Sequence, residues 1–286
     1  MTRILLTGAG GMLGLDLVSV LSGHDVTAMG RPDLDITDAD AVDRAVSGHY
    51  VVVNAAAYTK VDDAETHRDE AFAINAEGPI HLARACKAHG ARLIHVSTDY
   101  VFDGNATTPY PEDTPRNPAS VYGQSKAAGE EAIEEEYPEG SITIRTAWLY
   151  GEHGPNFPRT MLTLAKTRES IDVVTDQEGQ PTWTRDLAEW IRLLIDSDIR
   201  HGVFHGTNAG HTSWWDFARE VYRLASLDPE RIRPTTSESF PRPAPRPAWS
   251  VLGHDAWREA GLPSPRSWQE ALEEAFPVCF SDEVPR

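Results

Sequence analysis

The sequence predicts an α/β protein with a doubly wound parallel sheet and a smaller C-terminal lobe. Short, almost continuously apolar strand candidates alternate with helical patterns over the first 150 residues, which is typical of a parallel sheet covered by helices on both faces. A glycine-rich turn joins the first strand candidate to the first helix. After Gly151 the alternation gives way to loops mixed with helices, which indicates a second lobe.

The strand candidates are the short apolar runs of this N-terminal part. They are expected at residues 3–7, 25–29, 50–57, 91–98 and within 141–151. Helices are expected from Met12, over 69–90 with Gly90 as the C-cap, and over 120–137. Right-handed crossovers between parallel strands then give a doubly wound sheet. We expect a nucleotide-binding domain over 1–150 completed by a strand near 202–208, a lobe mainly over 151–276, and a frayed tail over 277–286.

The bulk composition excludes several classes of partner. The formal net charge of −18 disfavours binding to nucleic acid or to anionic membranes. Apolar runs are too short to span a membrane, and the N-terminus lacks the layout of a signal peptide. Cys86 and Cys279 are far apart and not in a metal-binding spacing, so we expect reduced thiols in a cytoplasmic protein.

The glycine-rich turn has the sequence TGAGGMLG, from Thr7 to Gly14. Glycines at 8, 11 and 14 follow a strand and open a helix. Such a turn lets backbone N–H groups approach a pyrophosphate, and the helix N-terminus favours its negative charge. The spacing differs from the GxGxxG of many dehydrogenases, but its context predicts a nucleotide site in a Rossmann-like domain.

The end of the second strand bears on the choice of nucleotide. Domains that prefer NAD usually offer an acidic residue there to the ribose hydroxyls, whereas an arginine can hold a 2′-phosphate. Here the strand ends in GRPD, which places Arg31 in that region. We therefore predict NADPH, with NADH left open because Asp33 and Asp35 lie close by. The alternative interpretation of Arg31 is a solvated surface side chain.

A second group of residues predicts the chemistry. Thr98 is at the carboxyl end of the fourth strand candidate, and Tyr122 and Lys126 are four residues apart on one helix face. An ammonium beside a phenol favours the phenolate, so we expect a lowered pKa for Tyr122. Such a tyrosine can exchange a proton with a carbonyl or alcohol oxygen, which Thr98 would polarise. A Tyr-x-x-x-Lys spacing alone also arises by chance.

These motifs, together with VVNAAAYTKVDDAE, HVSTDYVFDG and RTAWLYG, resemble the dTDP-4-dehydrorhamnose reductase family of the extended short-chain dehydrogenase/reductase superfamily. The resemblance covers roughly residues 3–276. It implies hydride transfer from NADPH or NADH to C4 of a dTDP-4-keto-6-deoxy-L-hexose. Tyr122 would donate the proton, Lys126 would bond the nicotinamide ribose, and Thr98 would orient the substrate oxygen.

The resemblance also implies a cofactor site and a substrate site. The expected cofactor residues are Gly8, Gly11, Met12, Leu13 and Gly14 at the pyrophosphate, Arg31 at the 2′-phosphate, Asp35 and Ile36 near the adenine, and Ala55, Ala56, Tyr58 and Asn75 beside the cofactor. The expected substrate residues are Trp148, Arg242 and Arg246.

Several alternatives stay open. Related 4,6-dehydratases carry Thr-Asp-Glu where this chain has Thr98-Asp99-Tyr100, and the missing glutamate argues against dehydration. A ketoreductase for another dTDP-4-keto-deoxysugar of natural-product glycosylation remains, as does a non-catalytic NADP-binding regulatory subunit. A homodimer is also left open.

A bridging metal is not expected. Some family members bind magnesium across a dimer through acidic residues. Asp16 matches the first acidic position in type, and its alternative role is a first-turn acid that complements the helix dipole. Arg185 occupies the second position, which disfavours magnesium. His95 and Trp214 are expected to pack rather than to react.

Overall fold

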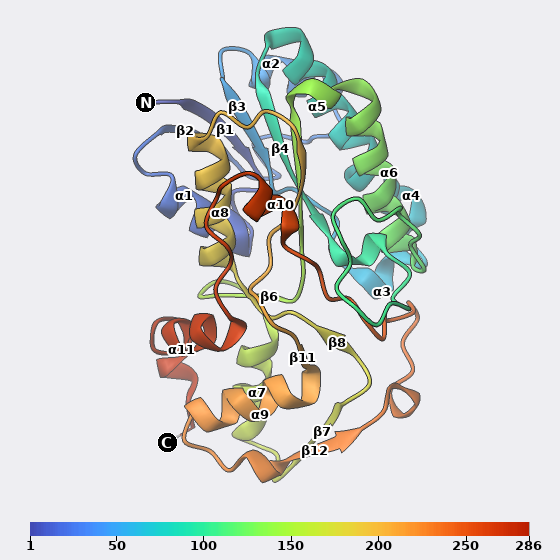
Figure 1. The fold of residues 1–286 in the computed structure, drawn as a ribbon, viewed down its shortest axis with the longest axis vertical. Helices are drawn as coiled ribbons and strands as arrows, with labels where there is room; N and C mark the ends of the chain where they lie inside the picture. Colours follow the sequence, from blue (N-terminus) through green and yellow to red (C-terminus); the bar gives the residue numbers. More distant parts are fainter. Residues whose placement is uncertain (286) are drawn as a thin grey trace.

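The computed structural model describes residues 1–285 and contains two lobes (Figure 1). The larger lobe is built on a six-stranded, wholly parallel sheet with the order β10-β5-β4-β3-β1-β2. Its strands are β1 (Arg3–Thr7), β2 (Asp25–Met29), β3 (Val51–Asn54), β4 (Arg92–Thr98), β5 (Ser141–Thr146) and β10 (Gly202–His205). This is the predicted Rossmann-like, doubly wound architecture.

The strands are continuously apolar because both faces of the sheet are covered. Side chains alternate between the two faces along a strand, so Ile4 and Leu6 of β1 belong to one buried cluster and Leu5 belongs to the other. The first cluster includes α1 (Met12–Val20) and α8 (Thr184–Asp196), which pack against each other. The second includes α2 (Ala39–Val46), α5 (Gly78–His89) and α6 (Val121–Glu136), on the opposite face (Figure 1).

The helix expected over 69–90 is in fact three segments. It starts as α4 (Arg68–Phe72), widens into a π-helical turn at Ala73–Glu77, and continues as α5, which ends at Gly90 in a left-handed conformation. Single π turns inside α-helices are frequent at functional sites, and this one contains Asn75. A short helix, α3 (Val61–Ala64), precedes it.

The smaller lobe has its own buried core. Three two-stranded ladders pair β6 (Leu149–Tyr150) with β9 (Thr182–Trp183), β8 (Glu178–Gly179) with β11 (Thr212–Ser213), and β7 (Ile171–Val174) with β12 (Ile232–Thr235). Helices α7 (Phe157–Ala165), α9 (Trp214–Leu224) and α11 (Trp268–Cys279) surround an aromatic cluster that contains Tyr150, Phe217 and Trp268.

The chain crosses between the lobes more than once. After β9, the chain returns to the larger lobe as α8, which packs beside the sheet. Strand β10 then adds an edge strand beside β5. A later helix, α10 (Asp255–Glu259), inserts Trp257 into the same core as α1 and α8. Part of the range 151–276 therefore packs with the sheet rather than with the smaller lobe. No helix within residues 1–285 is long and apolar enough to span a membrane.

The expectation of a frayed tail from Pro277 is wrong. Helix α11 continues through Pro277 to Cys279, and Phe280 is buried in the core of the smaller lobe. Pro277 lies on the exposed face of the helix, so the carbonyl group that it cannot bond faces water. Beyond the helix, Glu283 forms an ion pair with Arg159. Apolar residues on the inner face thus keep this segment in place.

We predict that Phe280→Ala lowers the free energy of unfolding by about 3–5 kcal/mol, because it removes a buried aromatic ring. Phe280 is 1% exposed, whereas Val278 is 55% exposed. The matched control Val278→Ala is expected to change stability by less than about 0.5 kcal/mol. Urea unfolding followed by tryptophan fluorescence measures both. Equal, small losses in the two variants would contradict the packing of this segment.

Candidate active site

The glycine turn lies directly against the chain that leaves β3. Gly8 has φ +72°, and a Cβ atom on it would lie 2.5 Å from the backbone of Ala55 and Ala56. Only glycine fits such a position. Strand β1 has β2 on one side and β3 on the other, so the chain direction across the sheet reverses here. In open α/β sheets, ligands bind outside the carboxyl ends of the strands at this switch point.

A second glycine brings the first helix close to the turn. A Cβ atom on Gly14 would lie 2.3 Å from the carbonyl oxygen of Gly8. Gly11 is the N-cap of α1 and offers no side chain to its first turn, which begins with Met12 and Leu13. The N–H groups of a first helical turn have no partners within the helix, so this end of α1 suits an anionic ligand.

In the loop after β2, the two aspartates form hydrogen bonds within the loop, whereas the side chain of Arg31 extends away from it. Asp33 accepts from the backbone N–H of Gly30, and Asp35 accepts from both the N–H and the hydroxyl of Thr37. These hydrogen bonds lower the pKa of Asp35. The side chain of Arg31 is 79% exposed and lies 3.8 Å from Glu70. Arg31 is thus an accessible cation at this end of the sheet, and its contact with Glu70 is a long one.

The chain segments that follow β2 and β3 both pack against the helical segment that contains Asn75 and Gly78. Ile36 is buried and packs against Gly78, where a Cβ atom would lie 2.6 Å from its side chain. Asn75, in the π turn, accepts from the N–H of Tyr58 at 2.8 Å and donates to its carbonyl oxygen at 3.0 Å. It also donates to the Ser125 hydroxyl of α6. Asn75 therefore ties the expected cofactor loop to the helix that carries Tyr122.

The three expected catalytic residues come together at the carboxyl end of β4. Thr98 ends that strand, and its side chain lies near that of Tyr122, where it acts to lower the pKa of the phenol. Ser120 caps α6 by accepting from the N–H of Gly123 at 3.1 Å, which sets where the helix begins. Tyr122 and Lys126 follow in its first turns, and both are buried.

The expected effect of Lys126 on Tyr122 is wrong for this structure. Burial raises the pKa of Tyr122 to about 12 instead of lowering it. The Nζ atom of Lys126 donates to the carbonyl oxygen of Val96 at 2.7 Å and lies 3.2 Å from Nε2 of His95. Burial also lowers the pKa of Lys126 to about 8. The amino group of Lys126 therefore bonds to the backbone of β4 rather than to Tyr122, and burial destabilises its charged form.

The two residues at the positions of the dehydratase Asp-Glu pair, Asp99 and Tyr100, have separate environments. Asp99 is buried and accepts from the Thr98 hydroxyl at 2.9 Å, and no group within residues 1–285 hydrogen bonds to its Oδ2 atom. Burial raises its pKa to about 6. The ring of Tyr100 meets that of Tyr122 edge-on at 5.6 Å between centroids. Tyr100 thus forms the next layer outward from Tyr122.

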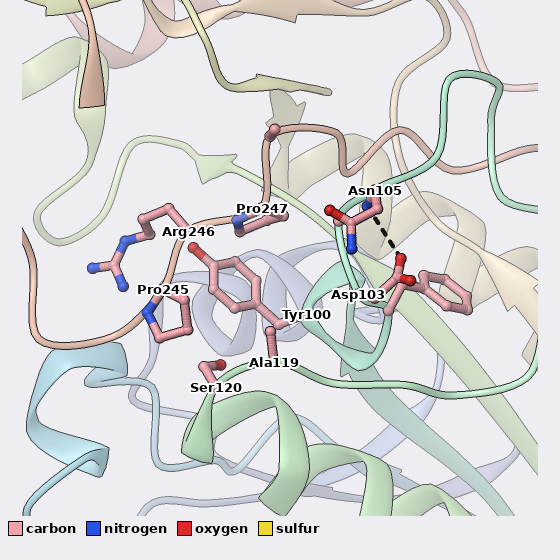
Figure 2. A pocket seen from close by; sticks show the side chains of 11 residues that line it. Tyr100, Asp103, Asn105, Ala119, Ser120, Pro245, Arg246 and Pro247 are labelled. Atoms are coloured by element: carbon pink, nitrogen blue, oxygen red, sulfur yellow. Dashed lines mark hydrogen bonds between the residues drawn. The ribbon is translucent and has the colours of Figure 1, made fainter. Parts of the chain in front are cut away.

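A pocket of about 320 Å³ opens beyond Tyr100 (Figure 2). It lies between the loop after β4, the start of α6 and the proline-rich segment around Pro245 and Pro247. Figure 2 shows the Tyr100 ring beside these prolines, with its hydroxyl toward the Arg246 side. Arg246 pairs with Asp62 at 2.9 Å, whereas Arg242 is exposed and outside the lining. Thr98, Tyr122 and Lys126 lie behind Tyr100 and do not line the pocket.

Trp148 occupies the crossing between the lobes in a strained backbone conformation. Its φ is +45°, which is uncommon for a bulky residue. The indole stacks on Trp214 with 3.5 Å between ring centroids, and Gly179 lies so close that a Cβ atom would be 2.4 Å from it. Trp214 packs, as expected, but against a residue of the expected substrate site.

Asp16 differs from the expected first-turn acid. It lies in the second turn of α1, is 8% exposed, and accepts from the Thr184 hydroxyl of α8. Burial raises its pKa. It therefore joins two packed helices rather than complementing a helix dipole. Residues 1–285 contain no group of three or more His, Cys, Asp or Glu side chains that could hold a metal ion, and the absence of magnesium stays a prediction.

Sequence reasoning missed two features of the site. Asn54 connects to His95 and through it to Lys126, and Asp62 holds Arg246. The sequence does contain a signal for the connection between Asn54 and His95, since asparagine and histidine are unusual inside buried, apolar strands. The second depends on a contact between residues 184 positions apart, which no local pattern contains.

The fold and this arrangement define a class of protein. A glycine turn at the switch point of a parallel sheet, with a Thr-Tyr-Lys group at the carboxyl end of β4 on the same edge, is the layout of an extended short-chain dehydrogenase/reductase, a nicotinamide-dependent oxidoreductase. Residues 1–279 match the family described as "RmlD substrate binding domain". The chain belongs to this dTDP-4-dehydrorhamnose reductase family.

Similar proteins cover nearly the whole chain. A Streptomyces antibioticus protein named "Probable dTDP-4,6-dihydroxy-2-methyloxan-3-one 4-ketoreductase" is 51% identical and aligns over 99% of this chain and 97% of its own length. A Streptomyces griseus dTDP-4-dehydrorhamnose reductase is 50% identical, over 96% and 93%. A crystal structure of the Bacillus anthracis dTDP-4-dehydrorhamnose reductase in complex with NADP has a TM-score of 0.93 and 38% identity, over 97% and 99%.

We predict that Gly14→Ala destabilises the protein by about 2–3 kcal/mol and weakens NADPH and NADH binding, because the methyl group would push α1 away from the turn. Gly10→Ala is the matched control for stability, since a Cβ atom there has no neighbour within 4 Å. Thermal unfolding and cofactor fluorescence measure the two effects. Wild-type stability in Gly14→Ala would contradict the close approach.

Proposed function

We propose that the protein uses NADPH to reduce the C4 keto group of a dTDP-4-keto-6-deoxy-L-hexose, and that its substrate is dTDP-4-dehydrorhamnose, giving dTDP-L-rhamnose. The observation that carries this proposal is the proximity of Thr98 and Tyr122 at the carboxyl end of β4, on the same edge of the sheet as the glycine turn. The names of the relatives described above support the substrate class.

The proton in this reaction would come from Tyr122. A bound nicotinamide would supply the hydride. With a pKa of about 12, the Tyr122 hydroxyl keeps its proton at neutral pH, which is the form that a proton donor needs. Thr98 would hydrogen bond the same substrate oxygen and hold it against Tyr122. Without substrate, the single Thr98 hydroxyl proton is donated to Asp99, so this proton would turn from Asp99 to the substrate oxygen when the sugar binds.

The cofactor would lie across the switch point of the sheet. Gly8, Gly11 and Gly14 would let the pyrophosphate approach the start of α1. Ala55 and Ala56 would flank the dinucleotide after β3. Arg31 would hold the 2′-phosphate of NADPH, because it is exposed and the neighbouring aspartates bond their own loop.

The substrate would lie between the lobes. Its sugar would face Thr98 and Tyr122, with Trp148 as an aromatic wall. Its nucleotide would extend toward the pocket beyond Tyr100, where Arg246 supplies a positive charge. Arg242, exposed on the same proline-rich segment, would reach the diphosphate as the segment closes.

A second candidate function is the reduction of another dTDP-4-keto-deoxysugar. It is favoured by the 51% identical relative, whose name specifies a different sugar. The two candidates differ in the hydroxyl groups that the pocket must accept, and such differences are read by a few polar contacts.

The deciding experiment follows the loss of NADPH absorbance with dTDP-4-keto-L-rhamnose, generated in situ from dTDP-glucose by a dehydratase and an epimerase. Oxidation that requires the epimerase supports the L-sugar reductase. Oxidation without the epimerase supports a D-sugar ketoreductase. Cofactor binding with no oxidation on either sugar would contradict both and favour the regulatory-subunit alternative.

We predict that Tyr122→Phe lowers turnover by about 10²- to 10⁴-fold, because it removes the general acid. NADPH affinity should stay within about threefold of wild type, since the ring and its packing remain. Steady-state kinetics and cofactor titration measure these quantities. Tyr222→Phe, in the core of the smaller lobe, is the control, and near-normal turnover in Tyr122→Phe would exclude the assigned role.

We predict that Arg31→Ala weakens NADPH binding by about tenfold while leaving NADH binding almost unchanged, because one exposed charge-assisted contact is worth roughly 1.4 kcal/mol. The control is Arg233→Ala, an exposed arginine on β12 of the smaller lobe. Fluorescence titration with both cofactors is the measurement. An equal loss for NADPH and NADH would remove the argument for the 2′-phosphate.

A further inference from the structure

A buried line of polar side chains crosses the apolar sheet. It runs from Thr7 on β1 through Asn54 on β3 and His95 on β4 to Lys126 on α6, and each of these residues is at most 2% exposed. The successive contacts measure 2.7, 2.9 and 3.2 Å. Buried polar groups are costly unless each donor meets an acceptor, so the direction of every hydrogen bond in the line can be worked out.

The orientation of Asn54 is set by a backbone group. Its Oδ1 atom accepts from the N–H of Ala56 at 3.2 Å and from the Thr7 hydroxyl. A backbone N–H can only donate, so the carbonyl end of the amide lies on this side. The Nδ2 atom then faces Nδ1 of His95 at 2.9 Å.

This orientation determines the tautomer of His95. An amide nitrogen can only donate, so Nδ1 of His95 must accept. Complete burial lowers the pKa of His95 well below its usual value, and the ring is neutral. Its single proton is therefore on Nε2, which points at Lys126.

Lys126 then meets a donor rather than an acceptor. An ammonium group has no lone pair and cannot accept a hydrogen bond from Nε2–H. A neutral amine accepts this bond and still donates to the carbonyl oxygen of Val96 at 2.7 Å. The contacts around Nζ are satisfied only in the neutral form.

The other charged groups near Lys126 do not restore the stability of its ammonium form. Glu130, one turn further along α6, favours the charged lysine. Its carboxylate is held by Arg145 of β5 at 2.8 Å and by Arg116 at 3.3 Å. Tyr122, one turn earlier, is a neutral phenol at neutral pH, and Asp99 lies beside Tyr122 at the end of β4.

We propose that His95 is a positioning residue that weakens proton binding by Lys126 before the cofactor binds, and that Asn54 sets the imidazole tautomer required for this. The role in catalysis rests on the proposed function, because it assumes that Lys126 acts with Tyr122. A Lys126 that binds its proton less tightly stabilises the Tyr122 phenolate less, so Tyr122 keeps the proton that reduction consumes.

The direct test is NMR of the cofactor-free wild-type protein with ¹⁵N-labelled histidine and ¹³Cε-labelled lysine. The chain has only four lysines, and Lys60, Lys87 and Lys166 are exposed; Lys126→Met and His95→Phe assign the two signals. We expect His95 to be protonated on Nε2 alone and Lys126 to titrate well below the other lysines. Protonation of His95 on Nδ1, or titration of Lys126 together with the exposed lysines, would overturn the proposal.

A variant tests the causal order. In Asn54→Asp, a carboxylate oxygen would accept from Nδ1–H of His95, which leaves a lone pair on Nε2 facing Lys126. The titration midpoint of Lys126 should rise by about one pH unit or more. The double variant Asn54→Asp with His95→Phe keeps the added charge but lacks the ring. If the rise persists there in full, charge alone explains it and the role of His95 is excluded.

The wild-type spectra decide the proposal even if Asn54→Asp does not fold. They also separate it from the proposed function, because the titration needs no substrate. A protein that reduces dTDP-sugars but carries the opposite tautomer would refute the inference alone. A protein with the expected tautomer and no reductase activity would refute the proposed function and leave the protonation state of Lys126 standing.

Discussion

The whole site depends on one close approach between two backbone segments. The chain that leaves β1 passes so near the chain that leaves β3 that no side chain fits between them at Gly8. Gly14 then lets α1 start directly against the same turn. The helix end, the end of β3 and the end of β4 consequently lie at one edge of the sheet. Larger residues at these points would separate the surfaces that a dinucleotide has to bridge.

The second determinant is desolvation at the carboxyl end of β4. Thr98, Asp99, Tyr122 and Lys126 are all buried, and burial disfavours the charged form of each titratable group. It raises the pKa values of Tyr122 and Asp99 and lowers that of Lys126. In the absence of ligand, burial therefore destabilises the charged form of each of these groups. Such a site interacts strongly with charge that develops during a reaction, because little water is present to screen it.

The fold and the position of the site could be predicted because their signals are local. Continuously apolar strands, helix caps and the glycine turn each fit within a few residues, and Tyr122 and Lys126 share one helix. The direction of the pKa shift at Tyr122 could not be predicted, because it depends on burial and on the carbonyl group of Val96 that attracts Lys126. The burial of Asp16 depends on Thr184, far along the chain. Pro277 suggested a helix end, but the apolar residues around it continue the helix.

The path of the chain between the lobes has a consequence for how the protein forms. The core beneath the sheet includes residues of α8, β10 and Trp257, which are synthesised long after the first five strands. These contacts join distant parts of the sequence, and such contacts slow folding. The nascent Rossmann-like half leaves the ribosome with its β5 edge and one apolar face uncovered, a state prone to association with other chains. Completion of the sheet is therefore a late event in the biogenesis of this protein, coupled to synthesis of the lobe that follows.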